Sequence, residues 1–307
     1  MSQYRWWTGV VSVCALALSS PSLRAQHTSG DPPPFTTRVV GRGTPIILIP
    51  GLTNNGAVWD GTVAELSKTH ECHVLSLAGF AGTAPVATDS LWLERMRDAI
   101  IDYARTRKLD KPVLIGHSLG GFLALDIAAT APELPSRVIN VDGLPFIGGV
   151  MMQTMTAEQM RPMAAQMRTM MQRATPEQSA AALEQNLRSM VRDTTAIPLL
   201  RTMGRTSDPR TVGEAMYELY TTDLRAKLAR ITVPVLNLHA WAAYKPMGQT
   251  RVRFDSVLTR QYATLRTGTT RVTDTSYHFI MFDEPVWFLA QVREALGQAG
   301  PAGGARR

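Results

Sequence analysis

Residues 111–121 read Lys-Pro-Val-Leu-Ile-Gly-His-Ser-Leu-Gly-Gly, an apolar run that leads into a serine framed by glycines. The apolar start predicts a buried strand, and the composition of residues 119–131 predicts a helix directly after it. The turn between them matches G-x-S-x-G, the pattern that exposes a serine hydroxyl at the carboxyl end of a strand. We therefore predict that Ser118 is a nucleophile. A phosphate-binding turn is disfavoured, because no lysine follows at P-loop spacing.

The rest of the chain repeats this alternation of apolar strand and helix. Short, wholly apolar strands separated by helices are typical of a parallel sheet that is covered on both faces. The sequence therefore predicts an α/β fold with a mostly parallel sheet flanked by helices. The expected strands are 44–50, 72–78, 111–116, 137–142, 233–238 and 270–273, and the expected helices are 57–68, 91–109, 119–131, 251–265 and 285–297.

The alternation stops at residues 143–230, which contain no strong strand candidate. We predict that they form a helical, Met-rich cap inserted into one α/β core made of residues 35–142 and 231–298. Methionine is flexible and fills irregular apolar gaps, so the cap methionines either line an apolar pocket or pack the cap helices together. Met151 and Met155 are the candidates for the pocket wall. The segment holds 11 of the 15 methionines, at positions 151, 152, 155, 160, 163, 167, 170, 171, 190, 203 and 216.

Three stretches give the chain a resemblance to the α/β-hydrolases over about residues 37–298. They are Ile49-Pro-Gly-Leu52, the turn at Ser118, and Ser276-Tyr-His-Phe-Ile-Met-Phe-Asp-Glu-Pro285. The resemblance implies an α/β-hydrolase fold and a catalytic triad in the chain order serine, acid, histidine. Dehalogenases and epoxide hydrolases of this fold use aspartate as the nucleophile, so the serine at position 118 disfavours them.

A serine hydroxyl needs a base to take its proton, and the resemblance implies that His278 is this base. His278 follows the last expected strand and precedes the last expected helix, where the family places the catalytic histidine. His239 ends an apolar strand and is expected to be packed or locally hydrogen-bonded. The side chain of His117 should point away from the hydroxyl, and His70 and His73 come too early in the chain.

The acid departs from the usual family pattern. In most relatives it follows the strand expected here at 233–238, but residues 239–246 contain no carboxylate. Some family members carry the acid one strand earlier, and Asp142 ends that strand in this chain. Asp142 is therefore the predicted acid, which would orient the histidine and stabilise its protonated form. An ordinary Asp-Gly turn is the alternative interpretation of Asp142, and Asp255 and Asp274 are the other candidates for the acid.

The resemblance also implies an oxyanion hole built from two backbone N–H groups. Leu119, directly after the nucleophile, is expected to give one of them. Leu52 is the best candidate for the other, with Thr53 possible through a shifted turn. Trp59 is predicted either to line the substrate pocket or only to anchor its helix.

The ends of the chain are predicted to lie outside the core. Residues 1–25 combine a basic start, a short apolar run and small residues, which is typical of a secretory signal peptide. An uncleaved membrane anchor and a lipoprotein attached at Cys14 are the alternatives. Residues 26–34 read as a linker and residues 299–307 as a flexible tail. The mature protein is therefore expected to be exported, to the periplasm or the medium, without stable membrane insertion.

Composition narrows the possible partners. The formal net charge is +7, but no dense basic run with interleaved aromatics indicates nucleic-acid binding. No cluster has metal-ligand spacing, and no cofactor is implied. Cys72 alone remains after signal cleavage, and its apolar surroundings predict burial. The oligomeric state is left open.

These observations predict a serine hydrolase that cleaves carboxylic esters of small to medium apolar substrates through an acyl-enzyme. A C–C bond hydrolase, a lactonase or an acyltransferase that uses the same triad is an alternative within enzymes. A non-catalytic receptor for a small ligand is the alternative outside them, because a fold alone does not establish turnover.

Overall fold

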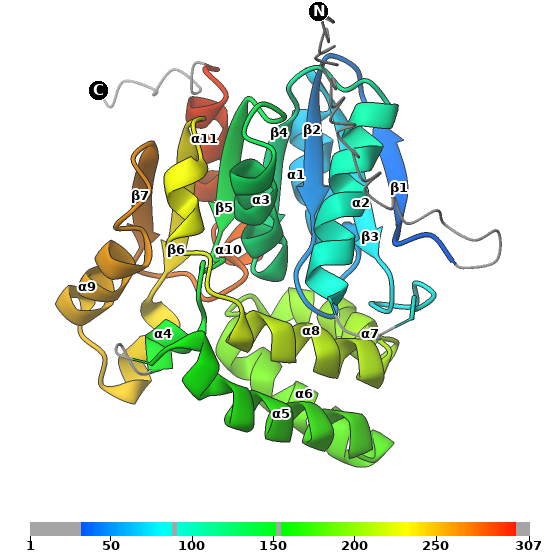
Figure 1. Cartoon of the computed structure of the whole chain (residues 1–307), viewed down its shortest axis with the longest axis vertical. Coiled ribbons are helices and arrows are strands. Elements are labelled where there is room, and N and C mark those ends of the chain that lie inside the picture. Colours follow the sequence, from blue (N-terminus) through cyan, green and yellow to red (C-terminus); the bar gives the residue numbers. More distant parts are fainter. Residues whose placement is uncertain (1–31, 88–90, 152–154, 299–307) are drawn as a thin grey trace, which may run out of the picture. The chain divides into compact units, whose positions relative to one another are not determined.

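A computed structural model describes residues 32–87, 91–151 and 155–298 of the chain. Its centre is a seven-stranded sheet in the order β1-β3-β2-β4-β5-β6-β7 (Figure 1). Only β1 runs antiparallel to its neighbour, and all other pairs are parallel. The strands are β1 (Phe35–Val40), β2 (Thr44–Ile49), β3 (His70–Leu77), β4 (Val113–His117), β5 (Arg137–Val141), β6 (Val235–Ala240) and β7 (Gly268–Thr273).

Helices cover both faces of this sheet. Ile47 and Ile49 of β2 pack with α2 and α3 on one face, whereas Ile46 and Leu48 pack with α1 and α11 on the other. Alternate side chains of a strand point to opposite faces, so a strand covered on both sides is apolar throughout. The helices around the sheet are η1 (Gly56–Trp59), α1 (Asp60–Leu66), α2 (Trp92–Thr106), α3 (Leu119–Thr130), η3 (Lys227–Arg230), η4 (Ala242–Met247), α9 (Arg251–Gln261), α10 (Ile280–Asp283) and α11 (Pro285–Ala295).

The segment between β5 and η3 is helical. Thr156 and Thr175 begin α5 and α6 with capping boxes, in which each threonine hydroxyl accepts from a backbone N–H three residues later, as S/T-x-x-Q sequences favour. Helix α5 packs against α8, and α6 packs against α7, so the four longer helices of the cap form two pairs. Its helices are α4 (Gly148–Met151), α5 (Ala157–Arg173), α6 (Pro176–Met190), η2 (Thr194–Ala196), α7 (Ile197–Arg205) and α8 (Pro209–Thr221).

Buried polar contacts attach the cap to the core. The carboxylate of Glu218 on α8 accepts hydrogen bonds from the backbone N–H groups of Trp92 and Leu93, at 2.6 and 2.7 Å. These are the first amides of α2, which have no acceptor within their own helix. Nearby, Gly79 has φ +83, and a Cβ there would lie 2.4 Å from the hydroxyl oxygen of Thr211. Only glycine permits this close approach of cap and core.

The structure also differs from the expectations. The strand β1 was not predicted, because Phe-Thr-Thr-Arg-Val-Val lacks the wholly apolar character of the inner strands. It forms because an edge strand has to be only partly buried, and it pairs from Phe35↔Leu77 to Val40↔Cys72. Cys72 is fully buried, as the sequence predicts, and burial raises the pKa of its thiol to about 11.

Several predicted segments have no structural description. The predicted signal peptide at 1–25, most of the predicted linker at 26–34, and the predicted tail at 299–307 lie outside the described residues. Among the residues that are described, no helix is both long enough and apolar enough to cross a membrane.

Candidate active site

The turn between β4 and α3 holds Ser118 in a strained backbone conformation, with φ 54° and ψ −116°. Glycines make this turn possible: a Cβ on Gly116 would lie 2.0 Å from the carbonyl oxygen of Gly120. A Cβ on Gly120 would in turn lie 2.2 Å from the carbonyl oxygen of Ile49. The backbone N–H of Ser118 donates to Val141 on the neighbouring strand at 2.8 Å. Strain of this kind persists only where the surroundings fix it. The turn exposes the hydroxyl at the carboxyl end of β4, where Ser118 lines a cavity.

The structure brings His278 and Asp142 together. The Nδ1 atom of His278 lies 2.7 Å from Oδ2 of Asp142, although 136 residues separate them in the chain. Asp142 directly follows β5, and His278 lies in the loop after β7. The other two acid candidates point elsewhere. Asp255 pairs with Arg251 on its own helix, and Asp274 accepts from Trp241 and Arg251 at 2.5 Å.

The second oxygen of Asp142 is also occupied. Its Oδ1 atom lies 3.2 Å from Nδ1 of His239 and accepts from the backbone N–H of Ala240 at 3.1 Å. Burial alone would raise the pKa of Asp142, but the hydrogen bonds from His239 and His278 outweigh it and hold the pKa below its ordinary value. Asp142 is therefore ionised at neutral pH. The sequence predicted a packed or locally hydrogen-bonded histidine at position 239. It did not predict the contact with Asp142, although the place of His239 at the end of the adjacent strand put it within reach.

His117 supports the loop that carries His278. Its ring is fully buried, and its Nε2 atom lies 3.1 Å from the backbone carbonyl oxygen of His278. Burial and the neighbouring His278 lower the pKa of His117 to about 3, so the ring is neutral and its Nε2–H donates to this carbonyl. The rings of His117 and His278 also pack with their centroids 4.6 Å apart. His117 thus contacts the backbone and ring of the predicted base.

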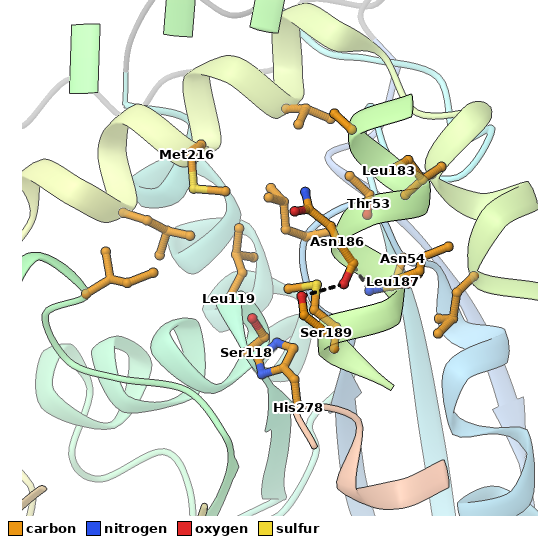
Figure 2. A pocket seen from close by; sticks show the side chains of 18 of the residues that line it. Thr53, Asn54, Ser118, Leu119, Leu183, Asn186, Leu187, Ser189, Met216 and His278 are labelled. Atoms are coloured by element: carbon orange, nitrogen blue, oxygen red, sulfur yellow. Dashed lines mark hydrogen bonds between the residues drawn. The ribbon is translucent and has the colours of Figure 1, made fainter. Parts of the chain in front are cut away.

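Ser118 and His278 lie at one end of a cavity of about 1620 Å³ between the sheet and the cap. Figure 2 shows the hydroxyl of Ser118 beside the imidazole of His278, with Leu119 and the cap residue Met216 farther along the wall. The cavity also has Leu52 in its lining. Leu119 is the first residue of α3, and the amide at that position has no acceptor within the helix. It is therefore available to an oxyanion.

Two pocket predictions are wrong. Trp59 is fully buried, stacked on Phe288 with ring centroids 6.4 Å apart, and does not line the cavity. It anchors η1 against the face of the sheet that α11 covers, which was the alternative interpretation. Met155 is half-buried but lies outside the cavity lining, because it precedes α5. The side chain of Met151 lies outside the described residues. The cap methionines that do line the cavity are Met170, Met171, Met190 and Met216, and the sequence held no signal that singled them out.

No group of three or more histidine, cysteine or carboxylate side chains in the described part of the chain is arranged to hold a metal ion. The residues that the strand ends bring together beside the cavity are a serine, a histidine and a carboxylate. A hydroxyl, an imidazole and a carboxylate in this arrangement are suited to nucleophilic attack on a carbonyl carbon.

Comparison with known proteins agrees with this geometry. A family model described as the alpha/beta hydrolase family matches residues 46–291. The chain is 28% identical over 206 residues to a pimeloyl-[acyl-carrier protein] methyl ester esterase of Nitrosomonas europaea, covering 65% of this chain and 77% of that protein. It is 34% identical over 105 residues to the esterase of the same name from Vibrio campbellii, which covers 34% of this chain and only 39% of that protein.

Solved structures show the same fold at low sequence identity. An enol-lactonase from Burkholderia xenovorans LB400 aligns with a TM-score of 0.67 and 18% identity, covering 86% of this chain and 96% of its own. An esterase from Exiguobacterium antarcticum aligns with a TM-score of 0.69 and 16% identity, with the same coverage of both chains. The likeness is therefore one of fold, over most of the chain.

The position of the acid gives a first prediction. We expect Asp142→Asn to lower kcat by about 10³- to 10⁴-fold on an aryl ester, because an amide cannot stabilise the histidine cation or hold its tautomer. Asp255→Asn and Asp274→Asn are the matched controls and should keep near-normal turnover. Steady-state kinetics on the four proteins checks this. Near-full activity in Asp142→Asn, together with a large loss in either control, would show that the acid is misassigned.

Proposed function

The chain belongs to the alpha/beta hydrolase family, and from this we propose that it is a serine hydrolase that cleaves carboxylic esters through an acyl-enzyme. The observation that carries the proposal is the position of Ser118. It stands on a strained, glycine-framed turn and lines the same cavity as His278, whose imidazole is hydrogen-bonded to the ionised Asp142. The curated relatives named above as methyl ester esterases support the same class of reaction.

In the proposed mechanism, the hydroxyl oxygen of Ser118 attacks the ester carbonyl carbon while Nε2 of His278 takes the hydroxyl proton. Asp142 bonds to Nδ1 of His278, which leaves Nε2 free to act as the base and stabilises the imidazolium that forms. The backbone N–H groups of Leu119 and Leu52 donate to the oxyanion of the tetrahedral intermediate. His278 then protonates the leaving alkoxide, and the C–O bond of the ester breaks.

Deacylation repeats these steps with water. His278 removes a proton from a water molecule, which attacks the carbonyl carbon of the acyl-enzyme. The same N–H groups hold the second oxyanion, and Ser118 recovers its proton from His278 as the acid product leaves. A lactone would be opened in the same way, because a lactone is a cyclic ester. Lactone hydrolysis is thus the second candidate activity of this site.

The cavity supports an apolar substrate of more than minimal size. Its volume of about 1620 Å³ exceeds the roughly 300–1,000 Å³ of most small-molecule sites. Its walls include the aliphatic and aromatic side chains of Leu144, Ile147, Leu219 and Phe254. Burial of apolar surface contributes about 25 cal/mol per Å², so each added methylene that reaches these walls should improve binding.

The nucleophile gives the central test. An active-site fluorophosphonate should label the wild-type protein and leave Ser118→Ala unlabelled, because the probe reacts only with an activated serine hydroxyl. Ester turnover should fall to the uncatalysed level in the same variant. Ser207→Ala is a matched control. Ser207 also lines the cavity, but its hydroxyl is hydrogen-bonded to backbone groups of the core and of the cap. Labelling that persists in Ser118→Ala would refute the proposal, and tight ligand binding without turnover in the wild type would indicate a receptor.

The cavity gives a prediction about specificity. On a series of p-nitrophenyl esters, kcat/KM should rise from acetyl to medium-length acyl chains, by up to about 4-fold for each methylene that becomes buried, at ~0.8 kcal/mol each. Lactones and acyl acceptors other than water are assayed beside the series. A maximum at acetyl would contradict the proposed use of the cavity, and faster lactone opening would identify the second candidate activity.

We propose export to the periplasm or the medium on the basis of residues 1–25 alone. Expression in a bacterial host with a Sec pathway tests this. The expected result is an exported protein whose amino terminus, determined by mass spectrometry, begins near Gln26. Recovery of the intact chain from the cytosol would count against export.

A further inference from the structure

The predicted acid has a second histidine partner that the mechanism above does not use. His239 is the penultimate residue of β6, only 1% exposed, and its Nδ1 atom lies 3.2 Å from Oδ1 of Asp142. The two oxygens of the carboxylate therefore face two different histidines, His278 on Oδ2 and His239 on Oδ1. The N–H of Ala240 is the third donor.

The far side of His239 is held by a buried polar network. Its Nε2 atom lies 3.0 Å from the hydroxyl of Tyr262, which is itself 2.7 Å from the carbonyl oxygen of Gly143. Asn140 on β5 is opposite Asn237 on β6 in the sheet register. The Nδ2 atom of Asn140 lies 2.9 Å from the Tyr262 hydroxyl, 2.8 Å from the Gly143 carbonyl and 3.0 Å from Oδ1 of Asn237.

The groups on the two sides of His239 hold its ring in one orientation. The N–H of Gly143 donates to Oδ1 of Asn140, which fixes the amide so that its two N–H groups face inward. The Tyr262 hydroxyl donates to the Gly143 carbonyl, and the two protons of Asn140 are shared among that carbonyl, Oδ1 of Asn237 and the Tyr262 hydroxyl oxygen. On the other side of the ring, the carboxylate oxygen of Asp142 accepts, so the Nδ1–H of His239 is the group that donates to Oδ1. A ring without a proton on Nδ1 would turn a lone pair toward the carboxylate.

A carboxylate held by one partner turns easily, because the terminal torsion of an aspartate side chain has a broad energy profile. Donors on both oxygens fix the plane of the group. We propose that His239 is a positioning residue, whose Nδ1–H locks the Asp142 carboxylate with Oδ2 toward His278, and whose ring is held in place by the hydroxyl of Tyr262. The inference rests on the proposed function, with Asp142 as its acid.

The chain contains a matched cluster that separates positioning from ordinary stability. His73 on β3 is 3% exposed, and its ring nitrogens lie 2.8 Å from the Tyr103 hydroxyl and 2.8 Å from a Glu71 carboxylate oxygen. It has the same three kinds of group as His239, Tyr262 and Asp142, but it does not line the cavity. Substitutions at His73 and Tyr103 therefore disturb a similar buried network without reaching the site.

The test compares the variants His239→Leu, His239→Asn and Tyr262→Phe with the controls His73→Leu and Tyr103→Phe. For each protein, kcat and KM are measured on a short-chain aryl ester, and kcat is normalised to the amount of folded protein, determined by circular dichroism. We expect His239→Leu to lower kcat by about 10- to 100-fold, the range found for partners that orient metal-bound histidines, with KM nearly unchanged. His239→Asn should recover most of this loss, because its side-chain amide can place a donor where Nδ1–H was. Tyr262→Phe should cause a smaller loss, and both control variants should keep the wild-type kcat.

A double-mutant cycle adds the decisive comparison. If His239 acts only through the acid, His239→Leu should cause no further loss of kcat in the Asp142→Asn background, because residues that act as a unit are not additive. Multiplicative losses would overturn the inference, and so would a rise in KM alone, which would make His239 a substrate contact. A wild-type kcat in His239→Leu would also overturn the inference. If His239→Leu does not fold, a wild-type kcat in Tyr262→Phe would overturn it instead.

The outcomes separate this inference from the function on which it rests. If the fluorophosphonate fails to label Ser118 in the wild type, the proposed function fails, whatever His239 does. If Ser118 is labelled and Asp142→Asn is inactive, but His239→Leu keeps full activity and normal KM, only the positioning role is refuted.

Discussion

The close approach of β2, β4 and α3 around Ser118 is the constraint on which the rest of the site depends. Gly116 and Gly120 allow backbone contacts that a single Cβ would block, since such an atom would lie 2.0 and 2.2 Å from carbonyl oxygens. Because the turn is packed against β2 on one side and bonded to Val141 of β5 on the other, the serine has a fixed position relative to both neighbouring strand ends. Those ends carry Leu52 and Asp142, the predicted oxyanion donor and the predicted acid.

Parallel pairing then decides what can meet the serine. The strands β4, β5 and β6 are consecutive in the sheet, so their carboxyl ends place Ser118, Asp142 and His239 side by side along one edge. Burial of an ionised carboxylate without partners costs free energy. Two histidines and one backbone N–H offset this cost at Asp142. With Asp142 after β5 as the predicted acid, the end of β6 carries no acid of its own. It carries His239, whose Nδ1 atom faces the carboxylate of Asp142.

The cap encloses the cavity, whereas the ends of the strands hold Ser118, Asp142 and His239. Its two helix pairs, α5 with α8 and α6 with α7, stand over the strand ends and enclose the large cavity with apolar side chains. The methionine-rich composition predicted a helical segment between two strands, but not which methionines face inward. Met170, Met171, Met190 and Met216 line the cavity, whereas Met160 and Met203 are buried among the helices themselves. Both interpretations of the methionines therefore hold, each for different residues.

The α/β alternation and the turn at Ser118 could be predicted from the sequence, as could the choice of His278 and Asp142. Each of these depends on local pattern, or on chain order within a recognisable family. The edge strand β1, the burial of Trp59 away from the cavity and the pairing of His239 with Asp142 became visible in the folded chain alone. These features depend on strand register and on contacts between distant residues, since 97 positions separate Asp142 from His239. No periodicity along the chain encodes which two side chains will face each other across adjacent strands.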